Sequence, residues 1–184
     1  MILSLIKSDL YRYSGDYKFI SFIKFWYYPG FRYTFFLRIA SSNKKRFLMH
    51  LFAVIFLRRY SIKYGIQIPR TTTIGKGLYI GHYGNIIINP KTIIGKNCNI
   101  NQGVTIGQSN RGKKVGSPQI GDSVWIGANT VIVGNVKIGN NVLITPNCYI
   151  NTDIPNDVIV INENKLKILE SKESTKDYIN NIII

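Results

Sequence analysis

Cysteine, histidine and acidic residues are scarce in this sequence, and each shortage excludes a class of protein. Among the 184 residues there are two cysteines and two histidines. Cys98 and Cys148 are far apart and form no CxxC pair, so neither a disulfide framework nor a cysteine-based metal site is expected. His50 and His82 are too few for a zinc site that needs about three histidine ligands. We therefore predict that the protein holds no metal.

The shortage of acidic residues leaves a strong positive charge. Nine Asp and Glu stand against 24 Lys and Arg, which gives a formal net charge of +15. An excess of this kind favours anionic partners, such as the phosphates of a nucleotide cofactor, an anionic membrane surface or a nucleic acid. A composition rich in Lys, Ile and Asn can equally carry such a charge without any partner. No nucleic-acid-binding motif accompanies the charge, so a nucleic acid is not expected as the partner.

Long apolar runs are missing as well. Met1 to Ile6 is followed at once by Lys7 and Asp9, so the sequence shows no secretory signal and we expect the protein in the cytoplasm. The most apolar run, Phe47 to Leu57, covers about half of the roughly 20 residues that a membrane-spanning helix needs. No spanning helix is predicted.

Basic residues flank that run, with Lys44, Lys45 and Arg46 before it and Arg58 and Arg59 after it. The pattern suits an amphipathic helix that lies on anionic lipid at the inner face of the membrane. Packing of the same helix against the rest of the chain or a neighbouring subunit is the commoner fate of an apolar stripe. Both interpretations stay open.

What the sequence does contain differs between its two parts. Residues 1–64 hold most of the aromatic side chains and few turn signals, so we expect helices there, with Pro29-Gly30 separating two of them. From Ile68 onward isoleucine recurs every sixth residue. The positions are 68, 74, 80 and 86, then 94, 100 and 106 after a slip of two residues, then 120, 126, 132, 138, 144 and 150 after a longer gap.

A period of six fits neither an α-helix nor a flat strand. It fits a coil of three short strands, in which each six-residue unit forms one side and one corner and points its isoleucine inward. Stacked coils then bury a continuous ladder of isoleucines. We expect a mainly β protein organised as a helical region at 1–64, a β-helix at 65–155 with a projecting loop at 108–119, and a tail at 156–184.

On these residues the chain resembles the hexapeptide-repeat acyltransferases, and within them the serine-acetyltransferase-like branch. The match covers residues 68–155 and, more loosely, the segment from Tyr28-Pro29-Gly30-Phe31 to Arg38-Ile39-Ala40. The resemblance implies a left-handed parallel β-helix with a short helical N-terminal region. It also implies a homotrimer with active sites between adjacent β-helices, and acetyl-CoA as the donor.

The segment Gly81-His82-Tyr83-Gly84 is similar to the family's His-x-x-Gly segment, which carries the catalytic base. An acceptor hydroxyl is a poor nucleophile at neutral pH, and an imidazole can remove its proton as the oxygen attacks the thioester. The resemblance therefore implies that His82 is catalytic. Without it, a single histidine on a repeat corner would be interpreted as a solvated turn residue.

The family resemblance also suggests where the donor binds. The break in the repeat at 108–119, QSNRGKKVGSPQ, corresponds to a loop that folds over the active site in family members. Its Arg111, Lys113 and Lys114 are candidates to pair with the donor's phosphates, although a solvated loop would look the same. Backbone contacts to the donor are implied at the positions that match the family's, namely Gly107, Ala128 and Pro146.

Three positions depart from the serine acetyltransferases. Gly81 replaces an Asp, Ser117 replaces a second His, and Gln67 replaces an Asp that orients the catalytic imidazole. Their joint absence removes charges that would hold a small zwitterion, which argues against serine as the acceptor.

The segments from His82 to Pro90 and from Ile94 to Asn97 look closer to bacterial O-acetyltransferases of capsular or exopolysaccharide synthesis. A neutral site suits a sugar hydroxyl. Its candidate substrate-binding residues are Tyr83, Asn85, Ser117 and Gln67. We therefore expect an O-acetyltransferase that acts on a sugar or a polysaccharide precursor.

Other functions are kept as alternatives. The first is a serine O-acetyltransferase, and the second is a non-catalytic basic module that binds a membrane or a nucleic acid. A metal-dependent β-helix, such as a carbonic-anhydrase relative, lacks the histidine ligands it would need. At the C-terminus, Ile161–Leu169 replaces the family's Gly-Val-Pro-Ala-Lys ending, so we expect the tail to leave the β-helix near Pro155 and to end in a short helix.

Overall fold

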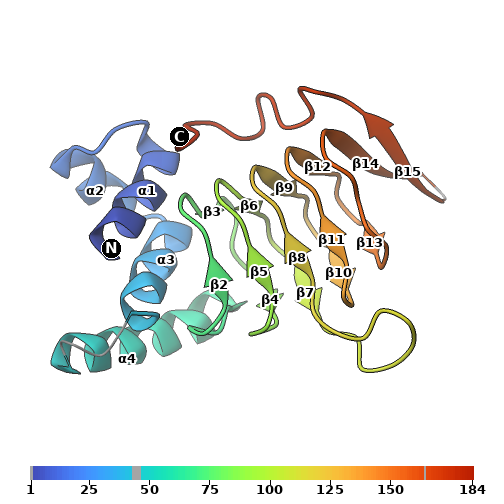
Figure 1. Ribbon diagram of the computed structural model, residues 1–184. Coiled ribbons are helices and arrows are strands. Elements are labelled where there is room, and N and C mark those ends of the chain that lie inside the picture. The colour runs from blue at the N-terminus through green and yellow to red at the C-terminus, as the bar shows by residue number, and fades with distance from the viewer. Residues whose placement is uncertain (1, 43–46, 164) are drawn as a thin grey trace.

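The computed structural model describes residues 2–42, 47–163 and 165–184. Helices gather at the N-terminal end of a three-sided parallel β-helix (Figure 1). The helices are α1 (Ile2–Ser14), α2 (Phe19–Trp26), α3 (Pro29–Ala40) and α4 (Phe47–Tyr64). The prediction of a parallel β-helix preceded by a short helical region is confirmed.

The strands form three sheets, one for each side of the prism. Sheet A contains β1 (Ile66–Gln67), β4 (Ile86–Ile88), β7 (Thr105–Gly107), β10 (Val131–Val133) and β13 (Tyr149–Ile150). Sheet B contains β2 (Thr73–Ile74), β5 (Ile93–Ile94), β8 (Gln119–Ile120) and β11 (Lys137–Ile138). Sheet C contains β3 (Tyr79–Ile80), β6 (Asn99–Ile100), β9 (Val124–Ile126), β12 (Val142–Ile144), β14 (Val158–Glu163) and β15 (Lys165–Glu170).

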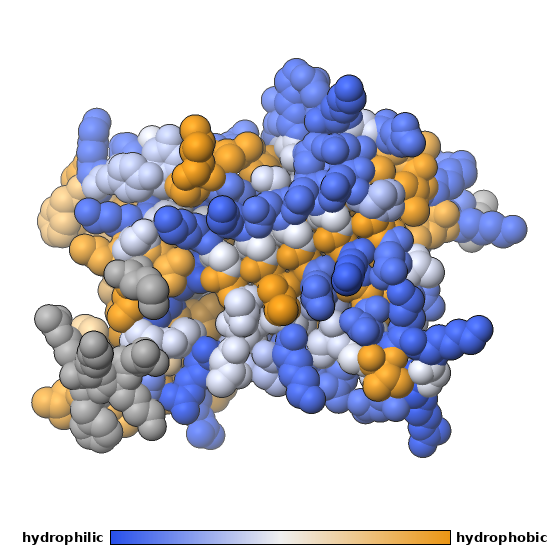
Figure 2. Space-filling model, viewed as in Figure 1, coloured by the Kyte–Doolittle hydropathy of each residue, from blue (hydrophilic) through white to orange (hydrophobic). Residues whose placement is uncertain are grey.

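The isoleucine ladder fills the prism. Ile80, Ile100, Ile126 and Ile144 lie at equivalent positions of sheet C, and each is almost fully buried. Most corners contain Asn, Ser or Gly with positive φ, because short polar residues and glycine tolerate that backbone conformation. Equivalent positions of successive coils carry similar residues, which Figure 2 shows as hydrophilic and hydrophobic stripes running along the β-helix.

The register corrects one assignment in the ladder. Ile88 lies opposite Ile106, which in turn lies opposite Ile132, so Ile88 is the ladder residue of its coil. Ile86, which the spacing placed in the ladder, lies two positions earlier in the same strand. The slip of two residues therefore lies between Ile80 and Ile88, in the corner that contains His82, and not between Ile86 and Ile94.

The C-terminal segment also differs from the expectation. Residues beyond Pro155 do not leave the coil, because β14 pairs in parallel with β12 and then turns back as the antiparallel strand β15. Residues 161–163 and 165–169 lie in these two strands, and residues 171–184 contain turns instead of the expected short helix. Alternating apolar and charged residues in this segment suit a strand with one solvated face.

After the hairpin the chain runs back along the outer face of sheet C toward α1 (Figure 1). Thr175 donates a hydrogen bond to Asn141, Asn99 donates to the carbonyl of Tyr178, and Asn97 donates to the carbonyl of Ile183. We call residues 171–184 the C-terminal strap. It ties the last coils of the β-helix to the first.

Buried charges join the helices to the first coil. Arg38 on α3 forms an ion pair with Asp9 on α1 at 2.8 Å, and it also donates to the carbonyls of Ile74 and Gly75. Arg12 donates to Gly77 O, to Asn99 Oδ1 and to Asn180 O. One arginine therefore fastens α1, the β-helix and the strap together.

Candidate active site

His82 lies on an enlarged corner between β3 and β4. From Ile80 to Ile88 this corner is two residues longer than the equivalent steps from Ile100 to Ile106 and from Ile126 to Ile132. The side chain is exposed, and neither ring nitrogen forms a hydrogen bond within the described part of the chain. The two extra residues enlarge the corner, and the imidazole lies outside the prism, where it is accessible to another molecule.

The backbone of this corner is open. Gly84 has φ of +117°, and a Cβ built there would meet no heavy atom within 4 Å. Asn85 follows with φ of +52°. Tyr83 turns toward the helical region, with its ring centroid 5.4 Å from that of Tyr64 at the end of α4. His82 thus stands beside an unobstructed stretch of backbone, next to an aromatic pair.

Successive corners stack on this one through backbone hydrogen bonds. The N–H of Gly103 donates to Gly84 O at 2.8 Å, that of Asn129 donates to Gln102 O at 3.0 Å, and that of Asn147 donates to Ala128 O at 2.9 Å. The structure therefore brings His82, Tyr83, Asn85, Ala128 and Pro146 to a single edge of sheet A. We call it the histidine edge.

Gly107 and the predicted loop residues lie at the opposite edge of sheet A, where the chain leaves the strands. Gly107 ends β7, and the loop 108–119 projects directly after it (Figure 1). Two backbone hydrogen bonds between Ser109 and Gly116 close the base of the loop. We call this the loop edge. The outer face of sheet A lies between the two edges.

The predicted loop residues have unequal surroundings. Arg111 and Lys113 are exposed near the tip. Lys114 instead forms an ion pair with Asp153 of the same chain at 2.8 Å, and its carbonyl accepts a hydrogen bond from Asn135. Lys114 is thus engaged within its own β-helix, unlike the two other cations.

Ser117 and Gln67, two of the predicted substrate-binding residues, do not lie at the histidine edge. Ser117 Oγ donates to Asn89 Oδ1 at 3.1 Å, and Asn89 donates to Gln108 at 3.3 Å, so these three residues form a polar cluster at the loop edge. Gln67 is exposed on β1 opposite Ile87, at the first strand of sheet A. No hydrogen bond joins either residue to His82 in the described chain.

The face between the two edges is partly apolar. Its outward side chains include Ile87, 44% exposed, and Tyr149, 59% exposed, with Val131 and Val133 half-buried between them. An exposed apolar strip of this kind favours binding of a ligand or of another protein surface.

Sequence reasoning missed Asn89 and Gln108 as partners of Ser117, since no motif links residues on different coils.

Trp125 lies on sheet C, outside this region. Its ring is 5.0 Å from that of Tyr178 in the C-terminal strap, so it packs under the strap and not under the projecting loop. In the described residues no group of three or more His, Cys, Asp or Glu is arranged to hold a metal ion.

Three features together define the class of hexapeptide-repeat transferases. They are a hexapeptide register, an enlarged corner that carries an exposed histidine, and a loop at the opposite edge of the same sheet. The family described as "Bacterial transferase hexapeptide (six repeats)" matches residues 117–152. A serine acetyltransferase of Helicobacter pylori (strain ATCC 700392 / 26695) is 33% identical over 129 residues, which cover 70% of this chain and 74% of that protein. The chain belongs to the serine acetyltransferase family.

Other relatives give the same result over different lengths. A serine acetyltransferase of Staphylococcus epidermidis is 39% identical over 97 residues, but the match spans 46% of that protein. The chain thus covers about half the length of such relatives. Among solved structures, the soybean serine acetyltransferase apoenzyme superposes with a TM-score of 0.74 at 25% identity, covering 91% of this chain and 69% of the other.

Proposed function

We propose that the protein transfers an acetyl group from acetyl-CoA to a hydroxyl oxygen, with His82 as the general base. In this reaction the imidazole takes the proton of the acceptor hydroxyl while its oxygen attacks the thioester carbonyl. The tetrahedral intermediate collapses, the C–S bond breaks, and the imidazolium returns the proton to the departing thiolate. The observation that carries the proposal is an exposed imidazole that forms no hydrogen bond with the described residues, on a corner two residues longer than its counterparts in the following coils.

The donor is proposed to bind along the outer face of sheet A. Gly107 would contact it at the loop edge, and the backbone at Ala128 and Pro146 would contact it at the histidine edge. Backbone N–H groups in this position can stabilise the oxyanion of the intermediate. Arg111 and Lys113 are free to approach its phosphates. Lys114 would first have to break its ion pair with Asp153, so we expect it to contribute less to donor binding than Arg111 and Lys113 do.

We propose a homotrimer, because the two sets of residues occupy opposite edges of one sheet. A second β-helix packed against this face would bring its own loop edge toward the histidine edge of the first. The apolar strip at Ile87, Val131 and Tyr149 would then be covered by the neighbouring subunit. Size-exclusion chromatography with light scattering tests this proposal, and a monomer at micromolar concentration would contradict it.

Serine is the acceptor that the relatives favour. Those relatives are named serine acetyltransferases, and the one from Helicobacter pylori aligns over most of both chains. A sugar hydroxyl is the second candidate, and a specific observation supports it. Gly81, Gln67 and Ser117 are uncharged where the family's charged residues are expected, and Ser117 donates its hydroxyl hydrogen bond to Asn89. A zwitterion would find few opposite charges there.

The experiment incubates the purified protein with acetyl-CoA and, separately, L-serine, nucleotide sugars and oligosaccharides. Thiol release is followed together with the mass of the acetylated product. Release with serine alone supports the first acceptor, and release with a sugar alone supports the second. No release with any hydroxyl compound contradicts the proposed activity.

A variant tests the role of His82. His82→Ala is expected to lower kcat/KM by about 10²–10⁴-fold, the usual contribution of a general base. Lys165→Ala, at an exposed position of β15, is the control and should keep the wild-type rate. Equal rates for the two variants would rule out His82 as the base.

We also propose peripheral contact between α4 and an anionic membrane. Exposed apolar side chains on α4 include Leu48, Phe52, Ile55 and Ile62, and Arg58 and Arg59 are exposed between them. This combination suits a helix that lies on anionic lipid. Lys44, Lys45 and Arg46, which the sequence placed at the start of this surface, lie outside the described residues. Within the described chain, none of the helices is both long and apolar enough to span a bilayer.

Sedimentation with lipid vesicles tests the membrane contact. Binding is expected to vesicles of phosphatidylglycerol and not to those of phosphatidylcholine, and it should weaken as salt rises, because exposed charges are screened. Ile55→Asp should abolish it. Equal sedimentation with both lipids, or no binding to either, would contradict the proposal.

A further inference from the structure

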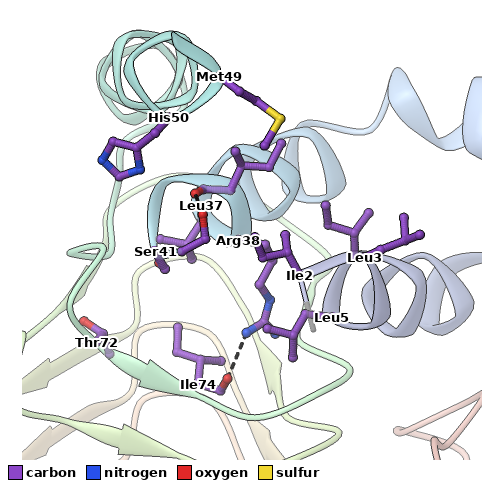
Figure 3. A pocket seen from close by; sticks show the side chains of 13 residues that line it. Ile2, Leu3, Leu5, Leu37, Arg38, Ser41, Met49, His50, Thr72 and Ile74 are labelled. Carbon is purple, nitrogen blue, oxygen red and sulfur yellow. Dashed lines mark hydrogen bonds between the residues drawn. The ribbon is translucent and has the colours of Figure 1, made fainter. Parts of the chain in front are cut away.

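A cavity separate from the candidate active site lies where α1, α3 and α4 meet the first coil (Figure 3). Its volume is about 820 Å³, within the range of small-molecule sites. Most of its wall is aliphatic, with Ile2 and Leu5 from α1, Leu37 from α3, Met49 from α4 and Ile74 from β2. Such a lining selects an apolar ligand.

Polar side chains interrupt the apolar wall, and besides Arg38 they are Ser41, Ser42, His50 and Thr72. His50 on α4 is 9% exposed and Thr72 in the first coil is 7% exposed, and both line the cavity. His50 Nδ1 and Thr72 Oγ1 are buried without a hydrogen-bond partner among the described residues. A buried polar group left unpaired costs about 1–3 kcal/mol, so both atoms favour a ligand that would pair with them.

The contact between Arg70 and His50 determines which ring nitrogen of His50 can donate a hydrogen bond. Arg70 Nη1 lies 3.0 Å from His50 Nε2. A guanidinium can only donate, so Nε2 accepts and the ring proton of the neutral imidazole is carried by Nδ1. The free group is therefore a donor, and the adjacent cation strengthens it. A ligand must present an acceptor oxygen to this nitrogen.

The remaining charge at the cavity is already neutralised. Arg38 lines the wall, but its guanidinium pairs with Asp9 and donates to the carbonyls of Ile74 and Gly75. Among the described residues that line the cavity there is no acidic side chain. A cationic head group would therefore find no counter-charge beside His50, while an anionic one would accept a hydrogen bond from an imidazole whose other nitrogen contacts the cation Arg70.

We propose that this cavity binds a free aliphatic carboxylic acid. The hydrocarbon chain lies among Ile2, Leu37 and Met49, and the carboxylate accepts hydrogen bonds from His50 Nδ1 and Thr72 Oγ1. The site shares no residue with the histidine edge or the loop edge. The proposal therefore does not depend on the proposed acetyl transfer.

Calorimetric titration with two ligands of equal chain length tests the proposal. Decanoate is expected to bind one molecule per chain. Decylamine, which has the same chain and a cationic head group, is expected to bind at least tenfold more weakly. Equal affinities, or no heat of binding with decanoate, would overturn the assignment of a carboxylate site.

Matched substitutions locate the site. Met49→Trp fills the cavity from α4 and is expected to abolish decanoate binding. Leu51→Trp adds the same ring to an exposed position of α4 outside the cavity and should leave binding unchanged. Identical affinities for the two variants would place decanoate elsewhere on the protein.

A substitution of each polar group tests the head-group assignment. His50→Phe keeps the ring and removes the donor, so the preference for decanoate over decylamine should disappear. Thr72→Val keeps the shape of its side chain, and it is expected to weaken decanoate binding at least fivefold even if His50→Phe fails to fold. Unchanged preference in folded variants would contradict the role of His50 and Thr72.

Discussion

The ring of Trp125 on β9 meets the ring of Tyr178 in the C-terminal strap edge to face, with centroids 5.0 Å apart and an interplanar angle of 67°. Asn99 on the neighbouring strand donates to the carbonyl of Tyr178 at 3.0 Å. The strap therefore covers the outer face of sheet C with specific contacts, and this face is occupied by the protein's own chain.

Removal of the tyrosine ring should loosen the strap. Tyr178→Ala is expected to lower the free energy of unfolding by about 0.5–1.5 kcal/mol, the usual contribution of an aromatic pair. Urea denaturation measures it. Tyr27→Ala, at a position 75% exposed, is the control and should change stability by less. Equal effects would mean that the strap adds nothing to the fold.

The buried ion pair between Asp9 and Arg38 gives a larger expected effect. Asp9→Asn leaves the Arg38 charge buried without its counter-charge, so we expect a loss of about 3–5 kcal/mol in chemical denaturation. Glu163→Gln breaks an exposed pair with Lys167 and should cost less than about 1 kcal/mol. A small effect of Asp9→Asn would show that the joint between helices and β-helix does not depend on this charge.

The register of the enlarged corner predicts opposite behaviour for two adjacent isoleucines. Ile88 is 2% exposed inside the prism, and Ile87 is 44% exposed on the outer face. Ile88→Ala is therefore expected to destabilise the protein by about 2–5 kcal/mol, because it leaves a cavity in the ladder. Ile87→Ala should cost much less. If thermal unfolding ranked the two variants in reverse order, the register at this corner would be wrong.

Both thiols should be inert in the folded protein. Burial raises the pKa of the Cys98 thiol to about 12, and burial also raises the pKa of Cys148. Because the thiolate is the reactive form, neither cysteine should react with a disulfide reagent at pH 8 until the protein unfolds. Mass spectrometry after brief labelling measures this. Rapid labelling of the native protein would contradict it.

The same burial predicts that stability falls in alkaline solution. Burial raises the pKa of the Tyr33 phenol to about 12, as it does for Cys98. Both groups ionise earlier in the unfolded chain than in the folded one, so their stabilising contribution is complete below about pH 9 and disappears as the pH rises toward 12. Denaturant midpoints measured between pH 8 and pH 11 should decrease. A flat profile would contradict the burial of these groups.

The candidate site could be predicted only in part. The motif around His82 and the polar run at 108–119 are local features, so the sequence showed them directly. Their arrangement is not local, because it depends on which edge of sheet A each corner reaches. The engagement of Lys114 with Asp153, 39 residues away, carries no signal in the pattern of either segment.

The sequence alone determined the architecture, because inward isoleucines at a period of six can be buried together only in a three-sided coil. It likewise determined that the aromatic N-terminal residues lie outside that coil. The tertiary structure decided which residues absorb the slip of two, how the strap returns along sheet C, and how Arg12 and Arg38 fasten the helices. Those contacts join residues that are distant in the chain, and their energies depend on burial that no local pattern records.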